Sequence, residues 1–418
     1  MKTNISLEEA QTLLLALAKP VKEGYVSLFD ATGRVLSQDI QAGQDLPPFA
    51  KSPLDGYALQ AKDTEKVAQL GSVKLSVIEE IRAGYLPAKK VTSGTASKVM
   101  TGAPVPAGAD VIIKYEAVER NGDYITISDI LNAGSNIIQA GEDIKKGETV
   151  AYKNNLLSPS LIGLFAGIGL SKVPVFNKVR VAILSTGDEL LDPAQELQPG
   201  KIYNSNLHSL RALCLKLGTE PIAFGIVADK QAVTAERISQ ALMVSDIVIT
   251  TGGASVGDYD VVLDALKQMA ANIIFWKVDM KPGSPVIAAE KNNKLIIALS
   301  GNPAAALITF NLIVVPLLKK MMGLACQLPL RISAVFADNF PKQSPQRRFL
   351  RGRIYRQDEK NYIKLTGEQS NGILKSMITC NALIDIPANS GPLCVGQKVS
   401  AVLVGNIDER TAAVLPGL

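Results

Sequence analysis

The sequence predicts a multidomain α/β plus β protein, in which one doubly wound α/β domain has smaller β domains on either side. The chain has 418 residues, enough for roughly two to four domains. From about residue 179 to residue 320, buried-strand runs alternate with helix-length segments. That alternation is typical of a mostly parallel sheet covered on both faces. Before and after it, the chain changes to short strands separated by turns.

The composition indicates a globular protein and excludes several classes of function. Hydrophobic residues make up 47% of the chain and charged residues 20%, which excludes wholesale disorder. A net charge of +5 is small for this length, so we expect no nucleic-acid partner. The chain has 1 His, and none of its 4 Cys are spaced as C-x-x-C. A multi-histidine metal site and a dithiol pair are therefore not expected.

The beginning of the chain looks like folded structure and not like a secretion signal. Ser6-Leu7-Glu8-Glu9 is a capping box that opens an amphipathic helix. Two acids ahead of the apolar stretch are unsuited to a signal peptide. The longest apolar run, residues 304–318, contains Asn311 and Pro316 and is too short to span a bilayer. We therefore expect a cytoplasmic protein with no membrane contact.

A small β domain follows the first fifty residues. Its strand signals are Val73–Ile78, Val111–Lys114 and Tyr124–Ile127, the last preceded by an Asn121-Gly122 turn. The α/β pattern then supplies five expected strands, at residues 179–184, 222–227, 246–250, 273–278 and 295–299. The expected helices between and after them cover residues 205–217, 231–243, 259–271 and 303–320. Five further short strands are expected at residues 331–336, 349–355, 362–365, 382–386 and 399–403.

Polar residues collect where the five α/β strands end. In a doubly wound sheet, ligands bind beyond the carboxyl ends of the strands, so these segments predict one crevice. The candidate ligand-binding residues are Thr186, Gly187, Asp188, Gly252, Gly253, Ser255, Gly257, Pro282, Gly283, Ser300, Gly301 and Asn302.

Two of these segments have the composition of anion-binding loops. Residues 251–257 and 300–303 are rich in glycine and serine, and each precedes a helix. Free amides at such a helix start bind phosphate, although a tight strand–helix loop has the same composition. Lys277 and Lys281 are placed to add positive charge, or they form an ordinary solvated pair.

Acidic residues also follow these strands. Asp188, Glu189, Asp229 and Asp260 would repel one another if they met unpaired, so their convergence predicts a divalent metal, most plausibly Mg²⁺. Singly, each is equally typical of a helix cap or first turn. His208 is expected to be a surface or core histidine. The densest basic run, residues 347–353, predicts either a wall that binds anions or a solvated edge strand.

Taken together and in order, these motifs resemble the MoeA family, the molybdopterin molybdenumtransferases that include the C-terminal domain of gephyrin. The α/β motifs are Thr186-Gly187-Asp188-Glu189-Leu190, Gly252-Gly253-Ala254-Ser255-Val256-Gly257, Lys281-Pro282-Gly283 and Gly301-Asn302-Pro303. The others are Ser52-Pro53-Leu54-Asp55-Gly56-Tyr57-Ala58, Met100-Thr101-Gly102-Ala103-Pro104-Val105-Pro106, Gly108-Ala109-Asp110 and Gly141-Glu142-Asp143. The resemblance covers nearly the whole chain and is weakest over the last ninety or so residues.

The resemblance implies an elongated homodimer of four-domain subunits. Its α/β domain would resemble the molybdopterin adenylyltransferase that acts one step earlier, which makes that enzyme a candidate partner. We expect a discontinuous linking domain at residues 1–50 and 140–178, and the small β domain at 51–139. The α/β molybdopterin-binding domain is expected at 179–326 and the C-terminal β domain at 327–418.

The resemblance also implies an activity. The family cleaves adenylylated molybdopterin with release of AMP and inserts molybdate into the dithiolene, assisted by Mg²⁺ or another divalent ion. The residues that match family active-site positions are Asp55, Thr101, Asp143, Glu189, Asp229, Asp260, Lys277 and Lys281. In the family dimer, the cleft lies between the α/β domain of one subunit and the small β domain of the other.

Two departures from the family pattern leave alternatives open. Residues 136–140 read Asn-Ile-Ile-Gln-Ala where the family usually carries arginines, and Ser284 replaces a second lysine. Fewer cations would weaken binding of molybdate or phosphate. The alternatives are a catalytically weakened or non-enzymatic molybdopterin-binding scaffold, and a pyrophosphatase that acts on another nucleotide. The sequence does not decide between molybdenum and tungsten.

Overall fold

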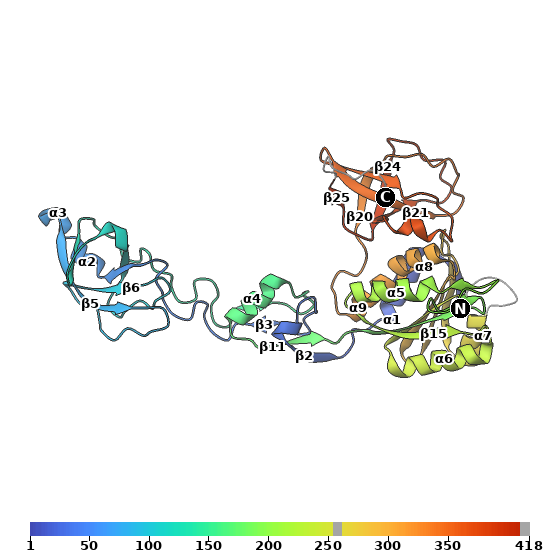
Figure 1. The fold of residues 1–418 in the computed structure, drawn as a ribbon, viewed down its shortest axis with the longest axis horizontal. Helices are drawn as coiled ribbons and strands as arrows, with labels where there is room; N and C mark the ends of the chain where they lie inside the picture. Colours follow the sequence, from blue (N-terminus) through green and yellow to red (C-terminus); the bar gives the residue numbers. More distant parts are fainter. Residues whose placement is uncertain (254–260, 410–418) are drawn as a thin grey trace.

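The computed structural model describes residues 1–253 and 261–409 of an elongated molecule. The small β domain lies at one end, the linking domain in the middle, and the α/β and C-terminal domains together at the other end (Figure 1).

The small β domain is a mixed six-stranded sheet with the order β7-β4-β6-β5-β9-β8. Its elements are β4 (Gly56–Leu59), α2 (Ala61–Thr64), α3 (Val67–Leu70), β5 (Val73–Ile81), β6 (Thr95–Val99), β7 (Val111–Lys114), β8 (Glu119–Asn121) and β9 (Tyr124–Ile127). Alternate residues of β4 face two separate clusters, because successive side chains of a strand point to opposite sides. Tyr57 and Leu59 join one cluster and Ala58 joins the other.

The linking domain is made of two antiparallel ribbons and a helix. Its elements are β2 (Glu23–Ser27), β3 (Ile40–Gln41), β10 (Thr149–Ala151), α4 (Pro159–Gly167) and β11 (Lys172–Phe176). Ser158 caps α4 by accepting a hydrogen bond from the Leu161 amide, and Pro159 takes the first helical position. Strands from both ends of the domain pair with one another, β2 with β11 and β3 with β10. These pairings join the two separate stretches of sequence into one body.

The α/β domain is built on a seven-stranded sheet with the order β1-β17-β18-β19-β16-β12-β15. Its strands are β1 (Lys2–Ile5), β12 (Arg180–Thr186), β15 (Glu220–Val227), β16 (Ile247–Thr251), β17 (Asn272–Val278), β18 (Ile287–Lys291) and β19 (Lys294–Leu299). A small two-stranded ribbon joins β13 (Leu190–Leu191) to β14 (Ile202–Tyr203). Only β18 runs antiparallel to its neighbours, and the sequence analysis did not predict this strand.

Helices cover both faces of this sheet (Figure 1). They are α1 (Leu7–Leu17), α5 (Ser205–Lys216), α6 (Gln231–Val244), α7 (Val261–Gln268), α8 (Pro303–Thr309) and α9 (Val315–Met321), with a π-helical turn at Phe310–Val314. Val181 and Ile183 of β12 face the cluster formed with α1, α5, α8 and α9. Ala182 and Leu184 face the cluster formed with α6 and α7. The strand is buried on both sides, which explains its continuous apolar run.

The predicted start of the linking domain needs a correction. Lys2–Ile5 pairs in parallel with β17 at the edge of the seven-stranded sheet. Leu7, Ala10 and Leu14 of α1 are buried in the α/β core. The first eighteen or so residues therefore pack on the α/β domain, although the chain then crosses to the linking domain. Pairing between residues so far apart in sequence cannot be seen in a local pattern.

Among the described residues, one helical stretch, Pro303–Met321, is long and apolar enough to span a membrane by length and composition. However, 78% of its apolar window is buried inside the protein. It packs against α1 and α5, so its apolar character is that of a core helix.

The C-terminal domain is a small closed barrel. Its elements are β20 (Arg331–Phe336), β21 (Arg348–Gln357), β22 (Lys360–Leu365), β23 (Ala382–Ile386), β24 (Lys398–Leu403) and β25 (Asp408–Glu409), with a 3₁₀ turn at Leu374–Met377. The barrel closes because β22 pairs with both β20 and β21. Phe349, Leu383 and Val402 belong to the same buried cluster as the α/β helices. The barrel is therefore packed directly against the α/β domain. The predicted fold class, an α/β domain with β domains on either side, is confirmed.

Candidate active site

A cavity of about 630 Å³ opens at the carboxyl ends of the α/β strands. The segments that follow β12, β15, β16, β17 and β19 all contribute to its wall, as the sheet topology leads one to expect. The predicted residues that line it are Thr186, Gly187, Glu189, Asp229, Gly252, Gly253, Gly283, Ser300, Gly301 and Asn302.

The floor of the cavity is bare backbone. Gly252 has φ +90°, and a Cβ there would lie 2.2 Å from the carbonyl oxygen of Thr186. A Cβ on Gly301 would lie 3.4 Å from Cα of Gly252, so the two glycine-containing loops touch. No larger residue fits at Gly252 without displacing the neighbouring backbone. The two loops and the end of β12 are therefore packed backbone to backbone in the cavity wall.

Helix α5 points its first turn at this floor. Oδ1 of Asn204 caps the helix by accepting a hydrogen bond from the Leu207 amide at 3.2 Å, and it also accepts one from Ser185 Oγ at 3.1 Å. Nδ2 of Asn206 donates to the carbonyl oxygen of Gly301 at 2.8 Å, which joins α5 to the opposite loop. The first turn of a helix carries partial positive charge and free amides, so this end of the cavity suits an anion.

Two buried polar groups on the wall are left without a partner. Thr186 Oγ1 and Asn204 Nδ2 make no hydrogen bond within the described part of the chain, although both residues are buried. An unsatisfied buried polar group costs free energy, and such groups are normally paired. Both residues line the cavity, but these two atoms themselves are buried in its wall. Asn204 and Asn206 were not predicted as site residues; the capping motif Asn204-Ser205-Asn206 before a helix was the available signal.

Of the acidic residues that the structure describes at the strand ends, Asp188 and Asp229 form a pair, and Glu189 follows Asp188 in sequence. The Asp188 amide donates to Asp229 Oδ2 at 3.3 Å, and the Asp229 amide donates to Asp188 Oδ1 at 3.2 Å. Glu189 folds back over Gly187, where a Cβ would lie 2.6 Å from its carboxylate. Among the described residues, no three His, Cys, Asp or Glu side chains are grouped so that they could hold a metal ion by themselves. Asp188 does not line the cavity, whereas Glu189 and Asp229 do.

The segment that carries the predicted lysines is only partly in the cavity wall. Gly283 and Pro285 line the cavity, but Lys277, Lys281 and Pro282 do not. Nζ of Lys277 lies 4.3 Å from the centre of the Trp276 ring. The Lys281 amide donates to the carbonyl oxygen of Arg347, which binds this segment to the C-terminal barrel. Among the described residues, no Lys or Arg lines the cavity, in contrast to the expected charge beside the loops.

The barrel contributes one residue to the wall. Asn371 lies in the loop between β22 and β23 and lines the cavity with Ser300 and Asn302. The sequence analysis missed it, since a lone Asn in a turn-rich stretch carries no distinctive signal.

Three predicted site residues lie far from this cavity within the same chain. Oδ1 of Asp55 accepts hydrogen bonds from the amide and the hydroxyl of Thr101, at 2.7 and 2.8 Å. These two bonds hold the pKa of Asp55 below its usual value. Asp143 precedes Ile144 of the linking-domain core, and its amide donates to the carbonyl oxygen of Leu46 at 3.0 Å. The small domain is at the opposite end of the molecule from the α/β domain (Figure 1).

The remaining predictions are easily placed. Ser255, Gly257 and Asp260 lie outside the described residues. His208 is exposed on α5, in agreement with a surface histidine. The basic run is neither an anion wall nor a solvated edge. Arg347 is paired with acids, Arg351 is completely buried, and Arg353 is paired with Asp408.

Comparison with known proteins gives the family. The sequence profile of the MoeA N-terminal region (domain I and II) matches residues 5–169, and that of the MoeA C-terminal region (domain IV) matches residues 333–404. The profile of a probable molybdopterin binding domain matches residues 182–320. The chain belongs to the MoeA family. Its membership, predicted from the motifs, is confirmed.

Two relatives illustrate how far the similarity to MoeA proteins extends. The molybdopterin molybdenumtransferase of Bacillus subtilis is 33% identical over 407 residues, which are 96% of this chain and 95% of that protein. The molybdopterin molybdenumtransferase of Staphylococcus aureus is 34% identical over 378 residues, 90% of each chain.

Solved structures agree with this assignment. A molybdopterin biosynthesis MoeA protein from Pyrococcus horikoshii superposes with a TM-score of 0.85 at 30% identity, over 96% of this chain and 99% of that one. The prediction of a MoeA-type transferase of molybdenum cofactor biosynthesis is thus confirmed. The comparisons lend no support to the alternative of a non-enzymatic scaffold.

Proposed function

We propose that this MoeA protein cleaves adenylylated molybdopterin with release of AMP and inserts molybdate into the dithiolene. The observation that carries this proposal is the cavity at the sheet edge, where two glycine-containing loops and a helix N-terminus converge beside Glu189 and Asp229. Such a surface suits the phosphates of a pterin nucleotide. The names of the full-length relatives supply the class of reaction.

The chemistry requires little covalent participation by the protein. Displacement at phosphorus depends on positioning and on stabilisation of charge more than on a protein nucleophile. Amides of the Gly252 and Gly301 loops would hold phosphate oxygens. Asp229 and Glu189 lie on the same wall and would orient the attacking oxygen of molybdate or water.

The same two carboxylates fit Mg²⁺. This ion accepts oxygen ligands and is commonly held by one or two carboxylates together with substrate phosphates. Asp229 and Glu189 supply that number, and Asp188 fixes the backbone of Asp229. When bound, Mg²⁺ would neutralise charge on the phosphate oxygens. Asp260, the fourth predicted metal ligand, lies outside the described residues.

A homodimer would account for the separation of the predicted site residues. Asp55 and Thr101 lie at the far end of the same chain, where they cannot reach its cavity (Figure 1). We infer that a second copy brings its small β domain over the cavity. Catalytic roles for Asp55, Thr101, Asp143, Lys277 and Lys281 stay predictions, as do contact with the adenylyltransferase and a cytoplasmic location.

The test uses the purified full chain with adenylylated molybdopterin, with and without molybdate and Mg²⁺, and AMP is measured by chromatography. We expect AMP release that depends on both additions. Absence of AMP at any molybdate concentration would overturn the proposal. AMP release that does not depend on molybdate, together with turnover of other nucleotides, would favour the pyrophosphatase. Complementation of a cell that lacks this step, scored with and without excess molybdate, shows whether anion binding is weakened.

A further inference from the structure

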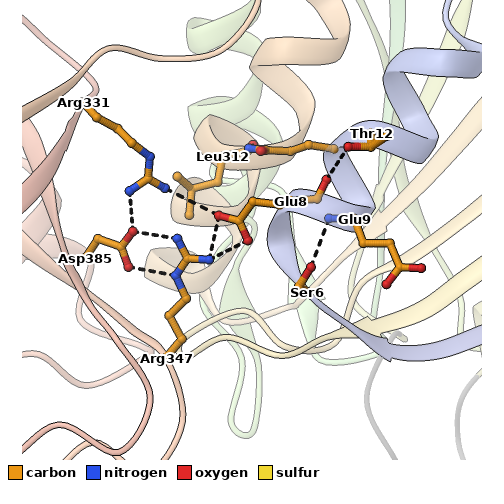
Figure 2. Close-up of polar contacts among 9 residues, drawn as sticks. Ser6, Glu8, Glu9, Thr12, Leu312, Arg331, Arg347 and Asp385 are labelled. Atoms are coloured by element: carbon orange, nitrogen blue, oxygen red, sulfur yellow. Dashed lines mark hydrogen bonds and ion pairs between the residues drawn. The ribbon is translucent and has the colours of Figure 1, made fainter.

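A cluster of four charged side chains joins the N-terminal helix to the C-terminal barrel, outside the cavity (Figure 2). Arg347 is at its centre. Its Nε and Nη2 donate to the two carboxylate oxygens of Asp385, at 2.8 and 2.7 Å. Its Nη1 lies 2.8 Å from both carboxylate oxygens of Glu8 on α1. Arg331 also donates to Asp385. One guanidinium therefore binds two segments that are far apart in sequence.

Burial shows which of these contacts matters most. The Asp385 side chain is 7% exposed and Arg347 is 21% exposed, whereas Glu8 is 57% exposed. Burial alone would raise the pKa of Asp385, but hydrogen bonds from Arg347 and Arg331 hold it below its usual value. A two-pronged pair shielded from water is stronger than an exposed ion pair. Arg347 and Asp385 are thus the firm part of the cluster, and Glu8 attaches α1 to it.

The backbone around these residues holds the segment that leads into the cavity wall. The Lys281 amide donates to the carbonyl oxygen of Arg347, and the Phe349 amide donates to the carbonyl oxygen of Lys281, both at 2.8 Å. The Asp279 amide donates to the carbonyl oxygen of Ile5 at 2.8 Å. Ile5 is three residues before Glu8. The segment at 279–281 is therefore held on one side by β1, the strand before α1. On the other side it is held by Arg347 and Phe349, at the start of β21.

The far end of this segment has little freedom. Gly283 lines the cavity, and a Cβ there would lie 2.1 Å from Thr309 Oγ1 of α8. The Val278 amide donates to the carbonyl oxygen of Ser284 at 3.0 Å, which closes the segment into a loop. Because the loop is this tight, we expect a shift of Lys281 to displace Gly283 in the cavity wall.

We propose that Arg347 is a positioning residue for the reaction. Its side chain joins α1 to the barrel through Glu8 and Asp385, and its main chain holds the loop at 279–285 in place beside the cavity. The substrate contacts that depend on it are those of the loop, with the phosphates of adenylylated molybdopterin. This inference rests on the proposed function.

The test compares Arg347→Ala and Arg347→Lys with Arg331→Ala in the full chain. Arg331 contacts the same carboxylates, but its main chain does not hold the loop, so it is the matched control. We expect Arg347→Ala to raise KM for adenylylated molybdopterin about 10- to 100-fold, with a smaller change in kcat. Arg347→Lys keeps the charge and lacks the two-pronged geometry, so it should give an intermediate KM. Amide hydrogen exchange of a peptide spanning residues 279–286 should accelerate in the same order.

Each possible result of these measurements supports or overturns the positioning role of Arg347. An unchanged KM and unchanged exchange of residues 279–286 in Arg347→Lys overturn the proposal, whatever happens to Tm. Equal effects in Arg331→Ala also overturn it, since the cluster would then contribute stability alone. The exchange measurement needs no turnover. A wild-type chain that releases no AMP therefore contradicts the proposed function, while the exchange data still decide the role of Arg347.

Discussion

Asp188 and Asp229 hold one another by reciprocal hydrogen bonds, each amide donating to the carboxylate of the other at 3.3 and 3.2 Å. This exchange joins the end of β12 to the end of β15 at the rim of the cavity. It leaves one oxygen of each carboxylate outside the pair. The arrangement separates two roles of Asp229, one in holding the backbone and one in presenting a charge.

Two substitutions at Asp229 should distinguish these roles. Asp229→Asn keeps an oxygen that can accept from the Asp188 amide but loses the charge, whereas Asp229→Ala loses both. We expect both to lower the rate of AMP release by about 10- to 100-fold. Only Asp229→Ala should also lower Tm, measured by calorimetry. If Asp229→Asn releases AMP at the wild-type rate, the charge has no part in the reaction.

Substitution of Gly252 should disturb the floor of the cavity. Gly252→Ala places a Cβ against the Thr186 carbonyl at φ +90°, and we expect it to cost about 3 kcal/mol of unfolding free energy. The control is Gly225→Ala in β15, where φ is +75° and a Cβ meets no atom within 4 Å. That change should cost only about 1 kcal/mol, from the backbone conformation alone. Equal losses in urea unfolding would show that the approach to Thr186 is unimportant.

Thr101 should control the ionisation of Asp55. The Thr101 amide, and after it the Thr101 hydroxyl, lower the pKa of Asp55. Thr101→Val removes the hydroxyl and keeps the amide, so the pKa should rise part of the way toward the usual value of 3.8. A carboxyl-carbon NMR titration measures this shift. As the pH is lowered, any step that needs ionised Asp55 should then be lost at a higher pH in Thr101→Val than in the wild type. An unchanged titration would exclude the hydroxyl bond as a cause.

The Asp385 carboxylate should make the stability of the chain depend on pH. Its pKa in the folded protein is lowered, so its contribution is complete above the usual value of 3.8 and is lost as the pH falls through the folded pKa. Asp385→Asn removes the buried charge partner of Arg347 and leaves it only the exposed Glu8, so it should cost about 3 kcal/mol at neutral pH. That cost should shrink as the pH falls below 3.8, because the wild type loses the same interaction.

An exposed ion pair provides the control for Asp385. Lys2 and Glu9 lie 2.6 Å apart, with side chains 57% and 40% exposed. Glu9→Gln should cost less than about 1 kcal/mol in the same unfolding experiment. If the two variants lose equal stability, the burial of Asp385 does not strengthen its pairs with the arginines.

Ser284 offers a direct test of weakened anion binding. It stands where the family pattern usually has a second lysine, in the loop that also carries Gly283 and Pro285. Ser284→Lys adds a cation beside the cavity and should lower the molybdate concentration needed for half-maximal AMP release by about tenfold. A neutral substitution of similar length, Ser284→Gln, should not have this effect. A molybdate requirement equal to that of the wild type would show that the missing lysine is not limiting.

Most of the regular structure could be predicted from the sequence, because helices and strands leave patterns of apolar residues within short segments. The strands at residues 179–184 and 246–250 are buried on both faces, so each contains an unbroken apolar run, Val181–Leu184 and Ile247–Ile249. The glycine- and hydroxyl-rich segments at the strand ends could be assigned to one crevice because parallel strands end at the same edge. Strand β18 and Asn371 escaped prediction, since neither an alternate strand direction nor a lone turn residue leaves a distinctive pattern.

The sequence by itself determined the family, the fold class and most of the residues that meet at the end of the sheet, because these follow from local periodicity and from motifs in order. Only the tertiary structure decided that Lys2–Ile5 completes the α/β sheet, and that Lys281 bonds to the barrel instead of lining the cavity. It likewise revealed that Glu8, Arg347 and Asp385 meet. These contacts join residues that are between 38 and 339 positions apart in sequence. They depend on how separately formed elements pack together, which no local pattern of side chains records.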